Sequence, residues 1–401
     1  MSFEPSSKIE HDLHPHMPAL GRFHSTKSLE RSEIYQELKP RILKVLNSYE
    51  LETLAPAAPA EPYYRAVAWN IERGMCLPEI LHFLKNHPVL SKADILLITE
   101  ADLGMARSGN HHVTRIIAEE LKMNYFFAPS YINLAKGCGI ENEFDGENEL
   151  GIHGNAILSR YPIQHPRLVS LPNPHDKMKG REKRLGNQRA LLATVNLGGH
   201  SLRVGCVHVN VRSTQKQRKE EIERIIRAIR EEGELPALVG GDWNTSTYDS
   251  HSAASAIIGF WIRVFMGTHN MIRNHYPHPE RFFEKDLFQM IEENGFDYKK
   301  CNAIGAPTNH FSVESIKQSK NLREWIPNWC FRFIDWSLKE HNGKCSFKLD
   351  WFAQRQLNIL RKEESTTDRK GTSLSPQVIG NLIHNGREAS DHDAIVVDFV
   401  M

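Results

Sequence analysis

The chain has 401 residues, of which 40% are apolar and 25% charged, and its formal net charge is +1. This composition is typical of a globular protein with one large domain, with or without appendages, and the small net charge excludes a global electrostatic attraction to nucleic acid or to anionic membranes. The six cysteines include no Cys-x-x-Cys pair, so the sequence predicts neither a disulfide framework nor a zinc site.

Residues 1–61 are predicted to lie outside the main domain as a tail, a helix and a linker. Residues 1–30 are polar and rich in histidine, which predicts a loose tail; a metal site at His11, His14 and His16 is the less favoured alternative. Residues 32–54 show helical spacing interrupted at Pro40, and residues 55–62 are rich in alanine and proline. We see no apolar region of a secretory signal and no apolar run that would span a bilayer, so we expect a cytoplasmic location.

From residue 62 onward, apolar strands alternate with helices, and six of the strands carry a polar or charged residue at or beside one end. These residues are Asn70, Glu100, His208, Asp242, Asp335 and Asp391. A charged group at the end of a buried strand is costly unless something pairs with it. Because core packing does not explain this recurrence, the sequence predicts a shared polar site.

The stretch from Leu238 to Thr245 is the most informative of these strand ends. An apolar run ends in two glycines, which permit the close approach of a backbone or a ligand, and Asp242 and Asn244 follow on one face of the strand. A carboxylate beside an amide suits a phosphate, its attacking water and a hard cation. The alternative is an Asx turn that closes a buried strand.

Two further segments have both a structural and a functional interpretation. Positive charge is concentrated in residues 177–189, either as a solvated face or as a phosphate contact that would include Arg189. Residues 250–283 are interpreted as an insertion in which Trp261, Phe265 and Met266 share one helical face. We expect this face to pack on the core; the alternative is a lid that contacts a lipid or a base.

Several short segments occur in a fixed order: WN at 69–70, ITE at 98–100, GNAILSRYPI at 154–163, the strand that ends at His208, GGDWN at 240–244, RFIDW at 332–336 and SDHDAIV at 390–396. The ordered set resembles the endonuclease/exonuclease/phosphatase superfamily, which includes deoxyribonuclease I, neutral sphingomyelinases, deadenylases and inositol-polyphosphate 5-phosphatases. The resemblance covers residues 62–401. It implies a four-layer α/β sandwich in which two mixed sheets pack face to face with helices outside.

The resemblance also implies roles for the polar residues. Asn70, Glu100 and Asp391 would bind Mg²⁺ or Mn²⁺ through oxygen atoms, and Arg189 would face the substrate phosphate. His392 would be held by Asp335, His208 would donate to a non-bridging oxygen, and Asn244 would hold the attacking water or a phosphate oxygen. Either Asp242 or His392 would be the general base, and the sequence leaves this choice open.

The expected activity is metal-dependent hydrolysis of a phosphodiester in nucleic acid. A phospholipid, phosphoinositide or sphingomyelin hydrolase that uses the aromatic insertion is the alternative. GDWNTS and the segment after His208 depart from the patterns of the 5-phosphatases and related branches, which leaves the substrate open but not the reaction type. His208 itself counts against the exonuclease III type, which has tyrosine there. A binding protein without catalysis ranks lowest, since all the expected polar positions are filled. Nothing in the sequence indicates an obligate protein partner.

Overall fold

The fold was analysed in a computed structural model. It describes residues 3–361 and 376–401, with gaps at 57, 138, 181, 246–258, 260, 264, 313–335, 337 and 342. In these described parts, no helix is both long and apolar enough to cross a membrane.

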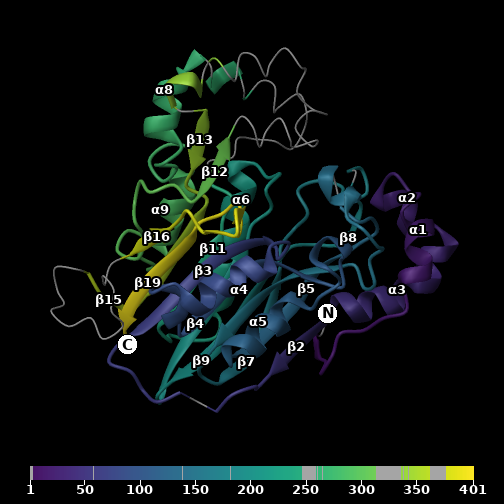
Figure 1. The fold of residues 1–401 in the computed structure, drawn as a ribbon, viewed down its shortest axis with the longest axis horizontal. Helices are drawn as coiled ribbons and strands as arrows, with labels where there is room; N and C mark the ends of the chain where they lie inside the picture. Colours follow the sequence, from purple (N-terminus) through teal and green to yellow (C-terminus); the bar gives the residue numbers. More distant parts are fainter. Residues whose placement is uncertain are drawn as a thin grey trace.

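Two large β-sheets form the centre of the molecule (Figure 1). Among the described residues the first sheet has ten strands. Eight of them lie side by side in the order β1 (Glu4–Pro5), β2 (Ser48–Glu52), β5 (Asn124–Asn133), β6 (Ile152–Ser159), β4 (Ile95–Leu103), β3 (Tyr64–Arg73), β19 (Ala394–Val400) and β15 (Asn358–Ile359). The other two are β16 (Gln377–Ile379), which pairs with β19, and β8 (Arg184–Gly186), which pairs with β5. The second sheet has β14 (Asp350–Arg355), β11 (Ala237–Asp242), β10 (His200–His208), β9 (Arg189–Leu197) and β7 (Ile163–Ser170). Both sheets mix parallel and antiparallel pairs.

The two sheets pack face to face through a layer of small and branched side chains. Ala66 and Leu97 from the first sheet share one buried cluster with Val204, Leu238 and Phe352 from the second. Gly240 lies in this layer, where a Cβ atom would come within 2.5 Å of the Phe352 ring and 3.0 Å of Leu97. The absence of a side chain therefore allows the sheets to approach each other at the end of β11.

Helices cover the outer face of each sheet. A cluster under the first sheet contains side chains of the helices α3 (Glu33–Leu46), α4 (Leu77–Asn86) and α5 (Val113–Leu121). A cluster on the second sheet contains those of α6 (Gln215–Arg230) and α9 (Lys285–Glu293). The layers run helix, sheet, sheet, helix, so the predicted four-layer sandwich is confirmed.

Short elements connect the layers. They are η1 (His14–His16), α1 (Met17–Leu20), α2 (Thr26–Glu30), η2 (Leu90–Lys92), η3 (Ala106–Ser108), η4 (Gly139–Glu143), α8 (Thr268–Asn270), the π-helix η5 (Met271–His275), η6 (Lys339–His341) and the two-stranded pairs β12 (Asn309–Ser312) with β13 (Lys344–Phe347) and β17 (Ile383–His384) with β18 (Arg387–Glu388). The β12–β13 pair lies beside the start of β19 (Figure 1), where Asn309 forms a bridge to His392.

The N-terminal segment is not a loose tail. Its strand β1 pairs with β2 and so extends the first sheet, and the amide of Ile9 donates to Glu50 Oε1 over 2.7 Å. A set of its apolar side chains is buried in the cluster under that sheet: Ile9, Leu13, Met17, Leu20 and Leu29. Because these residues recur every few positions, they bury an apolar face although the segment is polar overall.

The described part of the insertion also differs from the expectation. Trp261 is 38% exposed and Phe265 is 86% exposed, and Met266 is exposed as well. The following stretch does pack on the protein, since Met271 and Tyr276 are buried and the Tyr276 ring centroid lies 4.4 Å from that of Phe347. The expected burial of the Trp261 face in the core is therefore wrong.

Candidate active site

The polar strand ends meet at one edge of the two facing sheets. In the second sheet Asp242 closes β11 and is paired with His208 of β10 and with Asp350 of β14. In the first sheet Asn70 lies near the end of β3, and Glu100 lies on the neighbouring parallel strand β4. Asp391 and His392 lie in the short segment directly before β19.

The backbone of β3 and β4 is irregular where these two strands reach the site. The β3–β4 ladder shifts register between Asn70 and Arg73, and the β4–β6 ladder shifts between Ile98 and Ala101. Within these bulges the φ angles of Glu72, Arg73 and Glu100 are +45°, +65° and +57°. Such angles are unfavourable for residues with side chains and occur mainly at functional sites.

Asp242 is the centre of a hydrogen-bond network. Its Oδ1 accepts from the Asn244 amide over 2.8 Å, and its Oδ2 accepts from Asn70 Nδ2 over 3.1 Å. The Nε2 atoms of His208 and His392 lie 3.6 and 4.0 Å from the same Oδ2. Asn70 Nδ2 also lies 3.3 Å from Glu100 Oε1, so it connects both halves of the site.

The partner that holds His392 among the described residues is Asp350, whereas the sequence predicted Asp335 for this role. Its Nδ1 lies 2.9 Å from Asp350 Oδ2, and both side chains are buried. Asp335 lies outside the described residues. Burial alone would lower the pKa of His392, but Asp350, Asp391 and Asp242 together raise it well above its usual value. The remaining nitrogen, Nε2, faces the cavity between the sheets.

The loop that carries His392 is fixed to β3. Ser390 Oγ donates to the backbone oxygen of Asn70 over 2.7 Å and accepts from the His392 amide over 3.1 Å. Trp69 Nε1 donates to the backbone oxygen of His392 over 2.8 Å. The Ser-Asp-His segment and the Trp-Asn segment therefore position each other.

Gln188, which the sequence did not single out for a role, determines how His208 can act. Its Nε2 donates to His208 Nδ1 over 3.2 Å, so the proton of the neutral ring lies on Nε2. That nitrogen faces Asp242 and lies 3.7 Å from Glu100 Oε1. Burial lowers the pKa of His208 to about 4, so the ring is a neutral donor at neutral pH.

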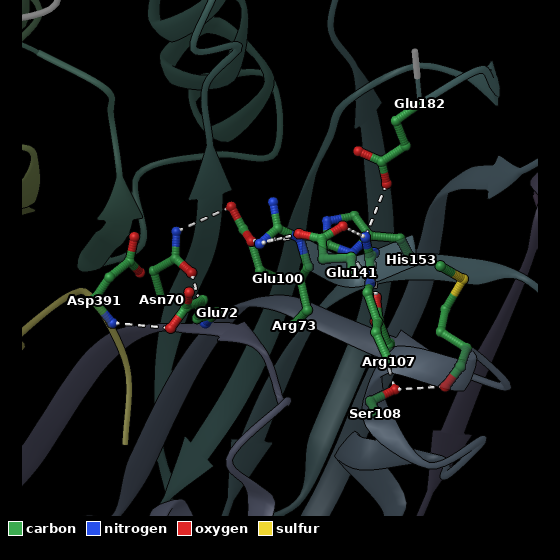
Figure 2. A network of polar contacts seen from close by, with 12 residues as sticks. Asn70, Glu72, Arg73, Glu100, Arg107, Ser108, Glu141, His153, Glu182 and Asp391 are labelled. Atoms are coloured by element: carbon green, nitrogen blue, oxygen red, sulfur yellow. Dashed lines mark hydrogen bonds and ion pairs between the residues drawn. The ribbon is translucent and has the colours of Figure 1, made fainter. Parts of the chain in front are cut away.

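Acidic groups gather at the first-sheet side of the site (Figure 2). The Asp391 amide donates to Glu72 Oε2 over 3.3 Å, next to Asn70 and Glu100. Burial, followed by the charges of Asp391 and Glu100, raises the pKa of Glu72 to about 8. Burial and nearby acids also raise the pKa of Asp391, and they raise that of Asp242 to about 7.

This cluster fits a hard divalent cation. Buried carboxylates that oppose one another's ionisation are relieved by a positive charge, and the donors on this side are oxygen atoms without sulfur. A second group that could share an ion, among the described residues, comprises Asp242, Asp350 and His392, whose donor atoms lie within 4.8 Å of one another.

An ion network supports Glu100 from the other side (Figure 2). Arg73 Nε lies 3.8 Å from Glu100 Oε2, and Arg73 Nη1 lies 3.0 Å from Glu141 Oε1. Arg107 bridges Glu141 to Asp102, and Asp102 in turn contacts His153. Although burial opposes ionisation, the charge of Arg73 keeps the pKa of Glu100 low.

Arg189 does not join the other predicted residues. It is buried, and its guanidinium donates to the backbone oxygen of Pro129 and to Asn47 Oδ1. The cations that line the site cavity are instead Arg73, Lys177 and Arg184. The basic segment, residues 177–189, does line the cavity, but through Lys177 and Arg184 and not through Arg189.

The cavity between these groups has a volume of about 290 Å³. It is lined by Glu100, His208, Asp242, Asn244, Asp391 and His392, all of them predicted from the sequence. The β12–β13 pair supplies an aromatic wall through Phe311 and Phe347. The arrangement therefore combines acids, two imidazoles, cations and an apolar surface in one concave space.

Comparisons with known proteins agree with this geometry. The sequence model of the Endonuclease/Exonuclease/phosphatase family matches residues 67–298, more than half of the chain. A search of the curated proteins found no match.

Solved structures with a similar fold include family members from Beutenbergia cavernae (14% identity, TM-score 0.47, covering 84% of this chain and 72% of that one) and Bacteroides vulgatus (15% identity, TM-score 0.45, covering 85% and 100%). The human nocturnin catalytic domain with bound sulfate is also similar (14% identity, TM-score 0.44, covering 86% and 96%).

Proposed function

The chain belongs to the endonuclease/exonuclease/phosphatase family, and we propose that it hydrolyses phosphodiesters of nucleic acid with a divalent metal ion, Mg²⁺ or Mn²⁺. One observation carries this proposal: carboxylates, an amide and two imidazoles from both sheets converge on a single cavity. These are the groups that in-line attack of water on a phosphate requires.

Asn70, Glu100 and Asp391 would hold the metal, and Glu72 stands close enough to Asp391 to take part. When bound, the ion would neutralise charge on the phosphate oxygens and favour ionisation of a water molecule. Arg73 and the Glu141–Arg107 pair would keep Glu100 in place and ionised.

Proton transfer would involve groups from both sheets. Asp242 and Asn244 would orient the attacking water, and of the two candidate bases, Asp242 and His392, the arrangement favours Asp242. The charge of Asp350 stabilises the protonated ring of His392, which would face the phosphate as a cation. His208 would donate its Nε2 proton to a non-bridging phosphate oxygen, a tautomer that the contact with Gln188 favours.

A second candidate function is hydrolysis of a phospholipid such as sphingomyelin or a phosphoinositide. The exposed apolar side chains Trp261, Ile262, Phe265 and Met266 favour it, because four large apolar groups close together in the sequence suit contact with a lipid surface. A protein that only binds phosphate esters ranks last, since no expected acid or histidine is replaced.

The test is a substrate panel of plasmid DNA, RNA, sphingomyelin liposomes and inositol phosphates, each with Mg²⁺, with Mn²⁺ and with EDTA. We expect cleavage of DNA or RNA that requires the metal. Cleavage of sphingomyelin or phosphoinositides alone would replace the first candidate by the second. Turnover of no phosphoester with either metal would refute the proposed function.

A further inference from the structure

One wall of the site cavity carries a positive charge that the surrounding acids do not neutralise. Next to Glu100, three arginines and three acids form contiguous ion pairs: Arg73, Arg107 and Arg184 with Asp102, Glu141 and Glu182. Glu100 lies 3.8 Å from Arg73 and adds a fourth acid, so the network itself has no surplus of positive charge. Lys177 lines the same cavity but is not part of the network, and it supplies the positive charge of this wall.

Lys177 has no carboxylate at ion-pair distance among the described residues. Its Nζ donates to a neutral oxygen, Asn210 Oδ1, over 3.0 Å and lies 5.3 Å from the centroid of the Tyr131 ring. The guanidinium carbon of Arg184 lies 5.3 Å from the same centroid. Two cations therefore share one aromatic ring; Arg184 is also paired with Glu182, whereas the ring attracts Lys177 without neutralising it.

The scaffold around these cations is rigid. Asn210 is held by Glu221 of α6, whose carboxylate accepts from the Asn210 amide over 3.1 Å and from its Nδ2 over 3.0 Å. Tyr131 lies on β5, is fully buried, and donates to Asn210 Oδ1 over 3.4 Å. Arg184 lies on β8, which pairs with β5. Arg184 is thus fixed on a strand, whereas Lys177 lies in the turn before β8 and is positioned by its contacts with Asn210 and Tyr131.

The charges around Lys177 favour the binding of an anion. Its ammonium is influenced by Arg184 and Arg212, which disfavour its charge, and by Glu221 and Glu182, which favour it. Burial and then Arg184 lower the pKa of Lys177 to about 7. A bound anion would reverse this effect, since it favours the charged form of both cations. A purely structural lysine would gain nothing from facing the cavity.

We propose that Lys177 and Arg184, set against Tyr131, bind a second phosphate of the substrate beside the phosphate that is cleaved. This inference rests on the proposed function and narrows the substrate to phosphodiesters that carry a further phosphate close by, as in an oligonucleotide. The opposite wall, with Phe311, Phe347 and Leu349, would contact the apolar part of the same molecule.

The experiment compares a thymidine dinucleotide that has only its internal phosphodiester with forms that carry an extra phosphate at the 5′ or the 3′ end. KM is measured with Mg²⁺ for the wild type, Lys177→Gln and Arg184→Gln. The wild type should prefer one phosphorylated form by roughly tenfold or more, the range of a charged hydrogen bond. In both variants this ratio of KM values should approach one.

Lys179→Gln is the matched control, because Lys179 belongs to the same segment but is exposed and does not line the cavity. It should keep the wild-type ratio, and Lys177→Arg should restore most of it. An equal KM for all three dinucleotides in the wild type, or an unchanged ratio in Lys177→Gln, would overturn the second subsite.

Thermal-shift titration with the same dinucleotides separates the two proposals. If none of them is cleaved, the proposed activity on nucleotides fails, but stronger stabilisation by a phosphorylated form, lost in Lys177→Gln, would still support the subsite. Equal stabilisation would refute it. Inositol phosphates that carry one or two phosphates are titrated in parallel. If the wild type prefers the form with two phosphates and Lys177→Gln abolishes this preference, the second phosphate belongs to a polyol.

Discussion

Asp350→Asn should disable the site without unfolding the protein. The change keeps the shape of the side chain but removes the charge that lies 2.9 Å from His392 Nδ1. Asp350 is buried beside Asp242, with which it is paired across β11 and β14, and its charge raises the pKa of Asp242. Removal of this carboxylate leaves the protonated His392 without its buried partner, so the melting temperature should fall by several degrees while the protein still folds.

The size of the kinetic effect follows from the distance. Opposite unit charges about 4 Å apart interact by about 4 kcal/mol at an effective dielectric constant of about 20. Loss of that interaction with a protonated His392 corresponds to roughly 10³-fold in rate, within the range known for acid–base groups. We therefore expect kcat to fall by about 10²- to 10³-fold, with a smaller change in KM.

The assay is steady-state hydrolysis of a phosphodiester by Asp350→Asn, His392→Ala and the double variant, together with circular dichroism to confirm folding. Because the two side chains act as one unit, the double variant should be no slower than the poorer single one. Asp335→Asn, which the sequence would have suggested, is the matched comparison. Losses that multiply for Asp350 and His392, or non-additivity between Asp335 and His392, would refute the pairing.

Further changes test neighbouring parts of the structure. Phe265→Ala should shift the free energy of unfolding by no more than about 0.5 kcal/mol, because the ring is 86% exposed; a loss of several degrees in thermal melting would mean that it is core. Weaker liposome sedimentation by the same variant would favour the lipid substrate. Gln188→Leu should lower kcat roughly tenfold or more by releasing the His208 tautomer, and an unchanged kcat would remove that role. Because the pKa of Lys177 is lowered to about 7, its positive charge is lost as pH rises, so the preference for the doubly phosphorylated dinucleotide should decline between roughly pH 6 and pH 8; a flat profile would contradict this.

Much of the fold and most of the site could be predicted because the signals were local. Asn70, Glu100, His208 and Asp242 each follow an apolar run of the sequence, and a polar residue in that position is costly unless it has a partner. The order of the short segments then indicated the family, and through it the four layers. Alternation of strands and helices alone would not have determined how the two sheets face each other.

Sequence reasoning could not choose between similar segments where only tertiary contacts decide, and Asp335 itself lies outside the described residues. FIDW at 333–336 and LDWF at 349–352 both place an aspartate next to a tryptophan. Only the pairing of Asp350 with Asp242 identifies the second as the partner of His392, and strand register cannot be read from one sequence. Arg189 was chosen from its position in a charged run, but a hydrogen bond to Pro129 turns it away from the cavity.

The most direct test of the metal-dependent hydrolase is the metal dependence of phosphodiester hydrolysis in the wild type and in Glu100→Gln. Glu119→Gln, which removes an exposed acid of α5, is the control. For the wild type and the control, we expect EDTA to abolish activity and Mg²⁺ or Mn²⁺ to restore it. In Glu100→Gln activity should stay lower by orders of magnitude, and stability without metal should fall somewhat, because the low pKa of Glu100 means that its charge stabilises the folded state. Full activity of Glu100→Gln at the same Mg²⁺ concentration would contradict the assignment of the site.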